Sequence, residues 1–244
     1  MSQSSQVFFS GKPFSVIEIP SAIRPDRNVV IVAKYNANNK KTGLMVQISI
    51  LDTSLNLRKI DGSEENGQGC SRPQCSAFDG CYVRSFFAHV GSIAKNLNDY
   101  RAGTLPKMNW ISFMALINGL DVRLGEFGDP AAMGLRYVEE IARRARKHTG
   151  YTHRWKSCDQ DLRFFLMASV ENMPDYDLAR KMGWKCFYVG GNPVKGDVMQ
   201  CPNEGPSGLL CNQCGLCNGA NAKFSISIEP HGQQKRKIGA LASV

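Results

Sequence analysis

The feature that most constrains this chain is a run of three cysteines, Cys211, Cys214 and Cys217, within the stretch CNQCGLCNG. A fourth cysteine, Cys201, lies ten residues earlier and is followed by Pro202. Four thiolates can enclose a zinc ion or an iron–sulfur cluster. Structural zinc usually takes two ligands from each of two separate C-x-x-C turns, whereas three crowded cysteines with a remote Cys-Pro are typical of cluster ligation. The spacing therefore predicts a metal centre and favours a 4Fe–4S cluster, with zinc as the open alternative.

A second cysteine group lies upstream, in the loop CSRPQCSAFDGCY, and comprises Cys70, Cys75 and Cys81. Three thiolates leave one position of a metal centre unfilled, either one iron of a four-iron cluster or the open position of a catalytic zinc. These cysteines can equally be ordinary loop and helix thiols. Cys158 and Cys186 lie outside both groups and are expected in the core.

The sequence shows no sign of a segment for export or for membrane insertion, so these cysteines are expected in a reducing compartment. The start of the chain has no basic segment followed by a long apolar one, so no signal peptide is expected. The longest apolar runs, such as FFLMASV, are much shorter than the roughly 20 residues that span a bilayer. We therefore expect a soluble, intracellular protein. In a reducing cytosol, clustered cysteines bind metal more often than they form disulfides.

The remaining pattern alternates strands with helices. Strands are expected at 27–36, 43–51, 121–127 and, with its exit loop, 150–155, and then at 163–170, 184–191 and 222–232; helices are expected at 81–97, 109–120, 129–148 and 174–183. Asp129 is the expected N-cap of the third helix, with Pro130 in its first position. Such alternation predicts an α/β fold with a mainly parallel sheet, either a partial or complete (β/α) barrel or, second, an open doubly wound sheet.

Three regions follow from this reading: an N-terminal segment (1–26), a barrel-like domain with the three-cysteine loop (27–195), and a cysteine-rich extension with a terminal strand and a basic tail (196–244). In parallel α/β folds, ligands bind where strands end. Glu126, Asp129, His153 and Ser169 lie in segments at the ends of predicted strands, and Cys70 lies in the cysteine loop downstream of the strand at 43–51. We therefore expect them around one opening.

Several stretches together resemble a family of bacteriophage and plasmid proteins, the gene product 88 family. They are KTGLMVQISIL, the loop ending in CYV, RLGEFGDPAA, TGYTHRW, MASV and the final CNQCGLCNG…HG, which cover roughly residues 40 to 232. The order of parts is also similar, more distantly, to the radical S-adenosylmethionine superfamily, whose members have a partial barrel and a three-cysteine loop after the first strand.

The resemblance to that superfamily implies a set of roles. Cys70, Cys75 and Cys81 would hold the cluster that binds S-adenosylmethionine. Gly125 and Glu126 would contact its methionine amino group, and Ser169 would lie near its ribose. The superfamily's usual loop is C-x3-C-x2-C, whereas this chain has C-x4-C-x5-C, a departure that leaves a barrel with inert clusters as an alternative.

Two residues are candidates for proton transfer, Glu126 and His153. Glu126 directly follows an apolar strand, where a carboxylate needs a partner, and the imidazole of His153 titrates near neutrality. Either can instead be a hydrogen-bonded structural residue, as can Asp129. His89, His148 and His231 are given no role.

The formal net charge of +9 permits a second function, binding to nucleic acid. Cations on the helix at 129–148, then Arg154, Lys156 and the tail QQKRK, are candidates for phosphate contacts, and Tyr151 and Trp155 for base stacking. The sequence thus predicts a radical S-adenosylmethionine-like iron–sulfur protein of phage or plasmid origin, with unknown substrate and an electron donor as partner. The alternative is a zinc-stapled nucleic-acid-binding protein for mobile-element replication or regulation, and a third possibility is a non-catalytic cluster protein.

Overall fold

The computed structural model describes residues 10–36, 39–54, 88–191 and 197–230. The strands in these ranges are β1 (Phe14–Pro20), β2 (Asn28–Asn36), β3 (Met45–Asp52), β4 (Asp121–Phe127), β5 (Lys147–Thr149), β6 (Tyr151–Thr152), β7 (Met167–Val170), β8 (Cys186–Val189), β9 (Val198–Gln200) and β10 (Ser225–Ile228). The α-helices are α2 (Ala88–Arg101), α3 (Trp110–Ile117), α4 (Gly134–Arg144), α5 (Met173–Lys181) and α6 (Cys211–Cys214), and the 3₁₀ turns are η4 (Pro130–Met133), η5 (Gln160–Phe164) and η6 (Gly219–Asn221).

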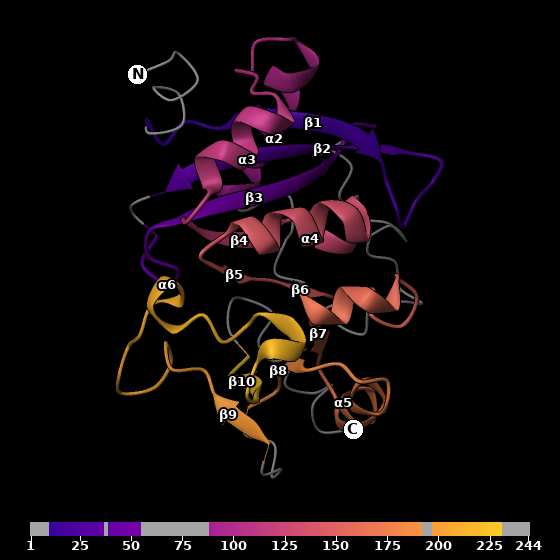
Figure 1. Cartoon of the computed structure of the whole chain (residues 1–244), viewed down its shortest axis with the longest axis vertical. Coiled ribbons are helices and arrows are strands. Elements are labelled where there is room, and N and C mark those ends of the chain that lie inside the picture. The colour runs from indigo at the N-terminus through magenta and orange to yellow at the C-terminus, as the bar shows by residue number, and fades with distance from the viewer. Residues whose placement is uncertain (1–9, 37–38, 55–87, 192–196, 231–244) are drawn as a thin grey trace.

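The strands form two five-stranded sheets (Figure 1), with the orders β1-β2-β3-β4-β5 and β6-β7-β8-β10-β9. β1, β2 and β3 pair antiparallel. From β3 onward every pairing in both sheets is parallel. Only Gly150 separates β5 from β6, and its carbonyl accepts a hydrogen bond from the Met167 N–H at the start of β7. The protein is therefore a mixed α/β protein whose two sheets are both rich in parallel pairs, and the predicted α/β class is confirmed.

The main core lies between one face of the sheets and helices α3, α4 and α5. Alternate residues of the strands point into it, among them Val46 and Ile48 of β3 and Ala168 and Val170 of β7. The helices contribute Phe113, Met114, Ile117, Val138, Ile141, Tyr176 and Ala179. Cys158 and Cys186 are buried in this core, which confirms their predicted place.

The opposite faces of the two sheets are covered differently. Helix α2 places Ile93 and Leu97 against Val30 and Val32 of β2. On the second sheet, the segment that carries the C-terminal cysteines packs Leu216 and Cys217 against a small cluster around Met167 and Ile226. The cysteine-rich segment is thus a cover for the face of the second sheet that α5 does not occupy.

Most predicted elements are present, but the start and the end of the helix at 129–148 and the start of the strand at 163–170 were predicted wrongly. The helix expected at 129–148 begins as the 3₁₀ turn η4 and ends at Arg144, because Ala145 adopts extended backbone angles and residues 147–149 pair with β4. Lys147 and His148 are therefore strand residues. In the expected strand 163–170, only Met167–Val170 is a strand, since Gln160–Phe164 forms η5.

Two strands were not predicted. β1 lies within the N-terminal segment 1–26, and it extends the first sheet through antiparallel pairing with β2. β9, three residues long, lies at the edge of the second sheet just before Cys201. In the described residues, no helix is both long enough and apolar enough to cross a membrane.

Candidate functional site

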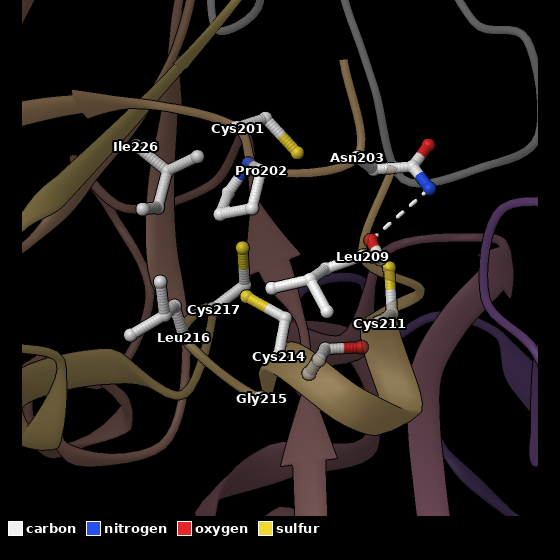
Figure 2. Close-up of a pocket in the computed structure, with 11 residues that line it drawn as sticks. Cys201, Pro202, Asn203, Leu209, Cys211, Cys214, Gly215, Leu216, Cys217 and Ile226 are labelled. Carbon is white, nitrogen blue, oxygen red and sulfur yellow. Dashed lines mark hydrogen bonds between the residues drawn. The ribbon is translucent and has the colours of Figure 1, made fainter. Parts of the chain in front are cut away.

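The four C-terminal cysteines line a single pocket. Cys201, Cys211, Cys214 and Cys217 surround it together with Leu209 and Ile226, among other residues, and no carboxylate or imidazole is among the lining side chains. Figure 2 shows the four cysteine side chains around this space, with the sulfur of Cys214 directed toward Cys217. About 290 Å³ free of protein atoms, part of it open to solvent, lies between these residues. The structure thus brings together the four cysteines that the sequence grouped.

Backbone hydrogen bonds from three other parts of the chain fix the cysteines. The Cys201 N–H donates to the Ser227 carbonyl (2.8 Å), which continues the pairing of β9 with β10. The Cys211 N–H donates to the Lys41 carbonyl (3.1 Å), and the Cys217 carbonyl accepts from Gly150 (2.9 Å). The cysteine segment is therefore tied to the loop before β3 and to the junction of β5 and β6.

The short helix α6 packs closely against the loop before β3 and against Lys147. The Asn212 N–H donates to the Thr42 carbonyl, and a Cβ at Gly43 (φ +68°) would lie 2.2 Å from Asn212 Oδ1. At the other end of α6, Gly215 adopts the left-handed conformation, and Lys147 Nζ donates to the carbonyls of Asn212 (3.3 Å) and Gln213 (2.9 Å). Lys147, predicted to be a helix residue that could contact phosphate, caps the carbonyl end of α6 instead.

The pocket favours neutral thiols in the bare protein. Burial raises the pKa of Cys201 and Cys211, and burial together with the three neighbouring cysteines raises the pKa of Cys217 well above its usual value. Arg123 of β4 acts in the opposite direction on Cys211 and Cys217. Since metal ligation requires thiolates, a bound cationic centre would have to displace these protons.

The donor set fits a thiolate-ligated centre, and the side chains surround the pocket without meeting at one point. In the ranges that the structure describes, no group of three or more His, Cys, Asp or Glu side chains is arranged to hold a metal ion as it stands. Cys70, Cys75 and Cys81 lie outside the described residues.

A second polar region lies at the carboxyl ends of β4, β6 and β7. Asp129, two residues after β4 and 5% exposed, accepts three hydrogen bonds: Oδ1 accepts from the Ala131 N–H (2.9 Å) and from Thr152 Oγ1 (2.7 Å), and Oδ2 accepts from the His153 N–H (2.9 Å). The predicted cap is confirmed on η4. The same carboxylate also fixes the exit of β6, a role that the sequence did not indicate.

His153 is paired with a buried carboxylate. Its Nε2 lies 3.0 Å from Oε1 of Glu171, whose side chain is 2% exposed, while the imidazole is 30% exposed. Ser169 Oγ donates to the same Glu171 oxygen (3.4 Å), and its carbonyl accepts from the indole N–H of Trp155. Trp155, considered above for base stacking, is buried in the core. Asp129, His153 and Ser169 therefore belong to one hydrogen-bonded network, through Glu171.

Sequence reasoning missed Glu171, although a signal was available. It directly follows the apolar strand β7, in the stretch MASVE. A carboxylate at such a position needs a partner when buried.

Glu126 lies on β4 and makes separate contacts. It forms an ion pair with Lys34 of β2 (2.6 Å) and accepts a hydrogen bond from Ser49 of β3 (3.2 Å). Gly125 beside it has φ +76°, and a Cβ there would lie 3.0 Å from Pro130 Cδ. The backbone turn before η4 is therefore sufficient to explain a glycine at this position.

The cations predicted to form a basic helix face are largely paired. Arg136 and Arg143 of α4 form ion pairs with Glu140 and Glu139 at i,i+4 spacing. Lys156 forms an ion pair with Asp175, and Tyr151 stacks on Phe187 at 4.4 Å between ring centroids. His89 lies on α2, His148 Nε2–H donates to the Phe165 carbonyl (3.0 Å), and the tail QQKRK with His231 lies outside the described residues.

In comparisons with known proteins, no family model, no curated protein and no solved structure matched the chain. The function must therefore be argued from the site itself.

Proposed function

We propose that this protein binds an iron–sulfur cluster, of the 4Fe–4S type, through Cys201, Cys211, Cys214 and Cys217, and that it is a radical S-adenosylmethionine-like protein of phage or plasmid origin acting in the bacterial cytoplasm. The observation that carries the proposal is the lining of one pocket by four thiols without any carboxylate or imidazole. Thiolates are the usual ligands of such clusters.

The arrangement of the four cysteines favours a cluster over a single zinc ion. Ligands of a zinc ion must all approach one centre to about 2.3 Å, whereas each cysteine of a cluster approaches a different iron. The described cysteines line one pocket without converging on a single point, which is better suited to the second arrangement.

The parallel strands support the barrel-like part of the proposal. All pairings from β3 through β9 are parallel, and β5 and β6 are interrupted only at Gly150. We therefore regard the two sheets as parts of one incomplete (β/α) barrel. The loop with Cys70, Cys75 and Cys81 follows β3, the first strand of that parallel series, which is where the superfamily has its cofactor cluster.

The second polar region would supply the ligand-binding end of this barrel. Ligands of parallel α/β folds bind at the carboxyl ends of strands, and Asp129, His153, Ser169 and Glu171 all lie there. In this proposal Gly125, Glu126 and Ser169 contact S-adenosylmethionine. A bound three-cysteine cluster would supply the electron that cleaves this cofactor, with an electron donor protein as partner.

The chain's own residues would position ligand and protons. Glu171 orients the imidazole of His153, because its carboxylate lies 3.0 Å from Nε2. Asp129 holds the His153 backbone through its N–H. A fixed and partly exposed imidazole at a strand end is suited to proton transfer.

Anaerobic purification of the full chain tests this proposal. We expect brown protein with broad absorbance at about 400 nm, and reductive cleavage of S-adenosylmethionine that is lost when Cys70, Cys75 and Cys81 are all replaced by Ala. Replacement of the core thiol in Cys158→Ala is the matched control and should leave both properties unchanged. Colourless protein with one zinc per chain would overturn the cluster and support the zinc-stapled alternative. Brown protein without cleavage activity would reduce the proposal to a non-catalytic cluster protein.

A further inference from the structure

Arg154 is an arginine in an unusual environment. It is 7% exposed, and its Nε is buried without a hydrogen-bond partner. Among the arginines whose side chains the structure describes, Arg154 alone is buried. Its charge is permanent, because the guanidinium does not deprotonate in proteins.

Other arginines in the described ranges show the opposite arrangement. Arg27, Arg146 and Arg180 form ion pairs at 2.8–2.9 Å, with Asp52, Asp121 and Asp197, and their side chains are 27–64% exposed. The most buried charge is expected to have the strongest ion pair, since the cost of desolvating a charge is highest there. In the described part of the chain, these aspartate partners are paired with the more exposed arginines.

The carboxylate of Asp129, which holds the residues just before Arg154, is already committed. Its oxygens accept hydrogen bonds from Ala131, Thr152 and His153. No ion pair between Asp129 and Arg154 is found within 4.0 Å in the described residues. Asp129 therefore organises the backbone around Arg154 without neutralising its side chain.

The backbone of Arg154 is held on both sides. Its N–H donates to Thr152 Oγ1 (2.9 Å), and its carbonyl accepts from the N–H groups of Ser157 (2.9 Å) and Cys158 (2.8 Å). It directly follows His153, so it lies at the carboxyl end of β6, where ligands of parallel α/β folds bind. With the backbone held in this way, the guanidinium can donate two parallel hydrogen bonds to a planar anion.

We propose that Arg154 is the anion-binding residue of the polar region at the ends of β6 and β7, and that it takes the carboxylate or phosphate group of a small-molecule ligand. The orphaned Nε and the burial of the guanidinium carry this inference, and it holds whether or not the cysteine pocket binds a cluster. It goes beyond the proposed function because it assigns a charged group to the ligand.

The test is an NMR titration of the full chain, observing the Nε–Hε resonance of Arg154, which is assigned by its loss in Arg154→Lys. Inorganic phosphate and acetate are the probes, and chloride at equal ionic strength is the control. We expect a saturable shift with phosphate or acetate and none with chloride, and the probe with the tighter binding identifies the group. No shift with either probe, or the same shift with chloride, would overturn the proposal.

Variants give a second, independent readout. The probe that binds should raise the thermal unfolding temperature of the wild type and of Arg144→Gln, which removes an exposed arginine of α4. This increase should vanish in Arg154→Gln and be partly kept in Arg154→Lys. An unchanged increase in Arg154→Gln would refute the assignment. If that variant does not fold, the wild-type titration decides.

Discussion

The cysteine pocket and the polar region at the strand ends are built on opposite plans. In the polar region the acceptors are matched within the protein: Asp129 accepts three hydrogen bonds, and Glu171 contacts His153 and Ser169. In the pocket, the backbone is held from three sides, while burial keeps the thiols of Cys201, Cys211 and Cys217 protonated. The first region has its geometry before any ligand binds. In the cysteine pocket the backbone is fixed, but the thiols would become metal ligands only after they lose their protons.

This difference predicts which property each region loses when it is mutated. Changes to the polar network should appear as lost stability of the protein itself. Changes to the frame of the pocket should appear mainly as lost metal. The following variants separate these two behaviours.

The largest loss of stability is expected for Asp129→Ala. It removes the cap of η4 and leaves the hydroxyl of Thr152 and the N–H of His153 without their acceptor, so the free energy of unfolding should fall by about 3 kcal/mol. Urea unfolding measures this. The matched control is Asp159→Ala, which removes an exposed cap with one bond, to the Asp161 N–H, and should cost about 1 kcal/mol. Equal losses in the two variants would show that the network around Asp129 adds nothing.

Gly43→Ala should cost less stability but affect the metal. Gly43 and Gly103 both have positive φ (+68° and +71°), so Ala at either site should cost about 1 kcal/mol. Only at Gly43 would the new Cβ displace Asn212 and hence the seat of α6, whereas Gly103 faces open space. We expect Gly43→Ala to lose metal in dialysis against a chelator faster than Gly103→Ala. The same rate for both would contradict the anchoring of the cysteines by this loop.

Glu126→Gln should have a smaller effect. It removes the ion pair with Lys34, in which both side chains are about one-fifth exposed, and the expected loss is about 1 kcal/mol or less. The loss should shrink when urea unfolding is repeated at high salt, because screening weakens a partly exposed pair. A loss that is independent of salt would indicate that the hydrogen bond from Ser49, and not the charge pair, holds Glu126.

The smallest effect is a pH dependence from His148. Burial lowers the pKa of its imidazole, and the hydrogen bond to the Phe165 carbonyl opposes this only in part. The unfolded chain therefore binds a proton at a higher pH than the folded one, so stability should fall as the pH drops below about 6.5. His148→Gln should remove this component of the pH profile measured by urea unfolding. A profile that is unchanged by the substitution would contradict it.

The sequence could predict those features that depend on local spacing. The grouping of Cys201 with the three later cysteines followed from ligand spacing, and the cap by Asp129 followed from the sequence Asp-Pro before an apolar period. The helix was extended too far because Ala145 continues its apolar period and His148 and Gly150 are typical of a helix end. The backbone instead turns at Ala145, and Lys147 pairs with β4. Strand β9 gives no periodic signal because it has only three residues.

Features that depend on long-range contacts could not be predicted. Nothing in the sequence shows that Glu171 lies against His153, or that Arg154 is buried while Arg136 and Arg143 are paired on the surface. The expectation of one opening was met only in part, since Asp129, His153 and Ser169 share a network while Glu126 contacts Lys34 and Ser49.

The most direct test of the central claim is elemental analysis of a variant in which only the C-terminal cysteines can bind metal. Cys70, Cys75 and Cys81 are replaced together by Ala, and the full chain is purified without oxygen. We expect about four irons and four sulfides per chain, lost when Cys211→Ser and Cys214→Ser are added but not when Cys158→Ala is added. Protein that contains neither iron nor zinc before those two changes would contradict the assignment of the pocket as a metal centre.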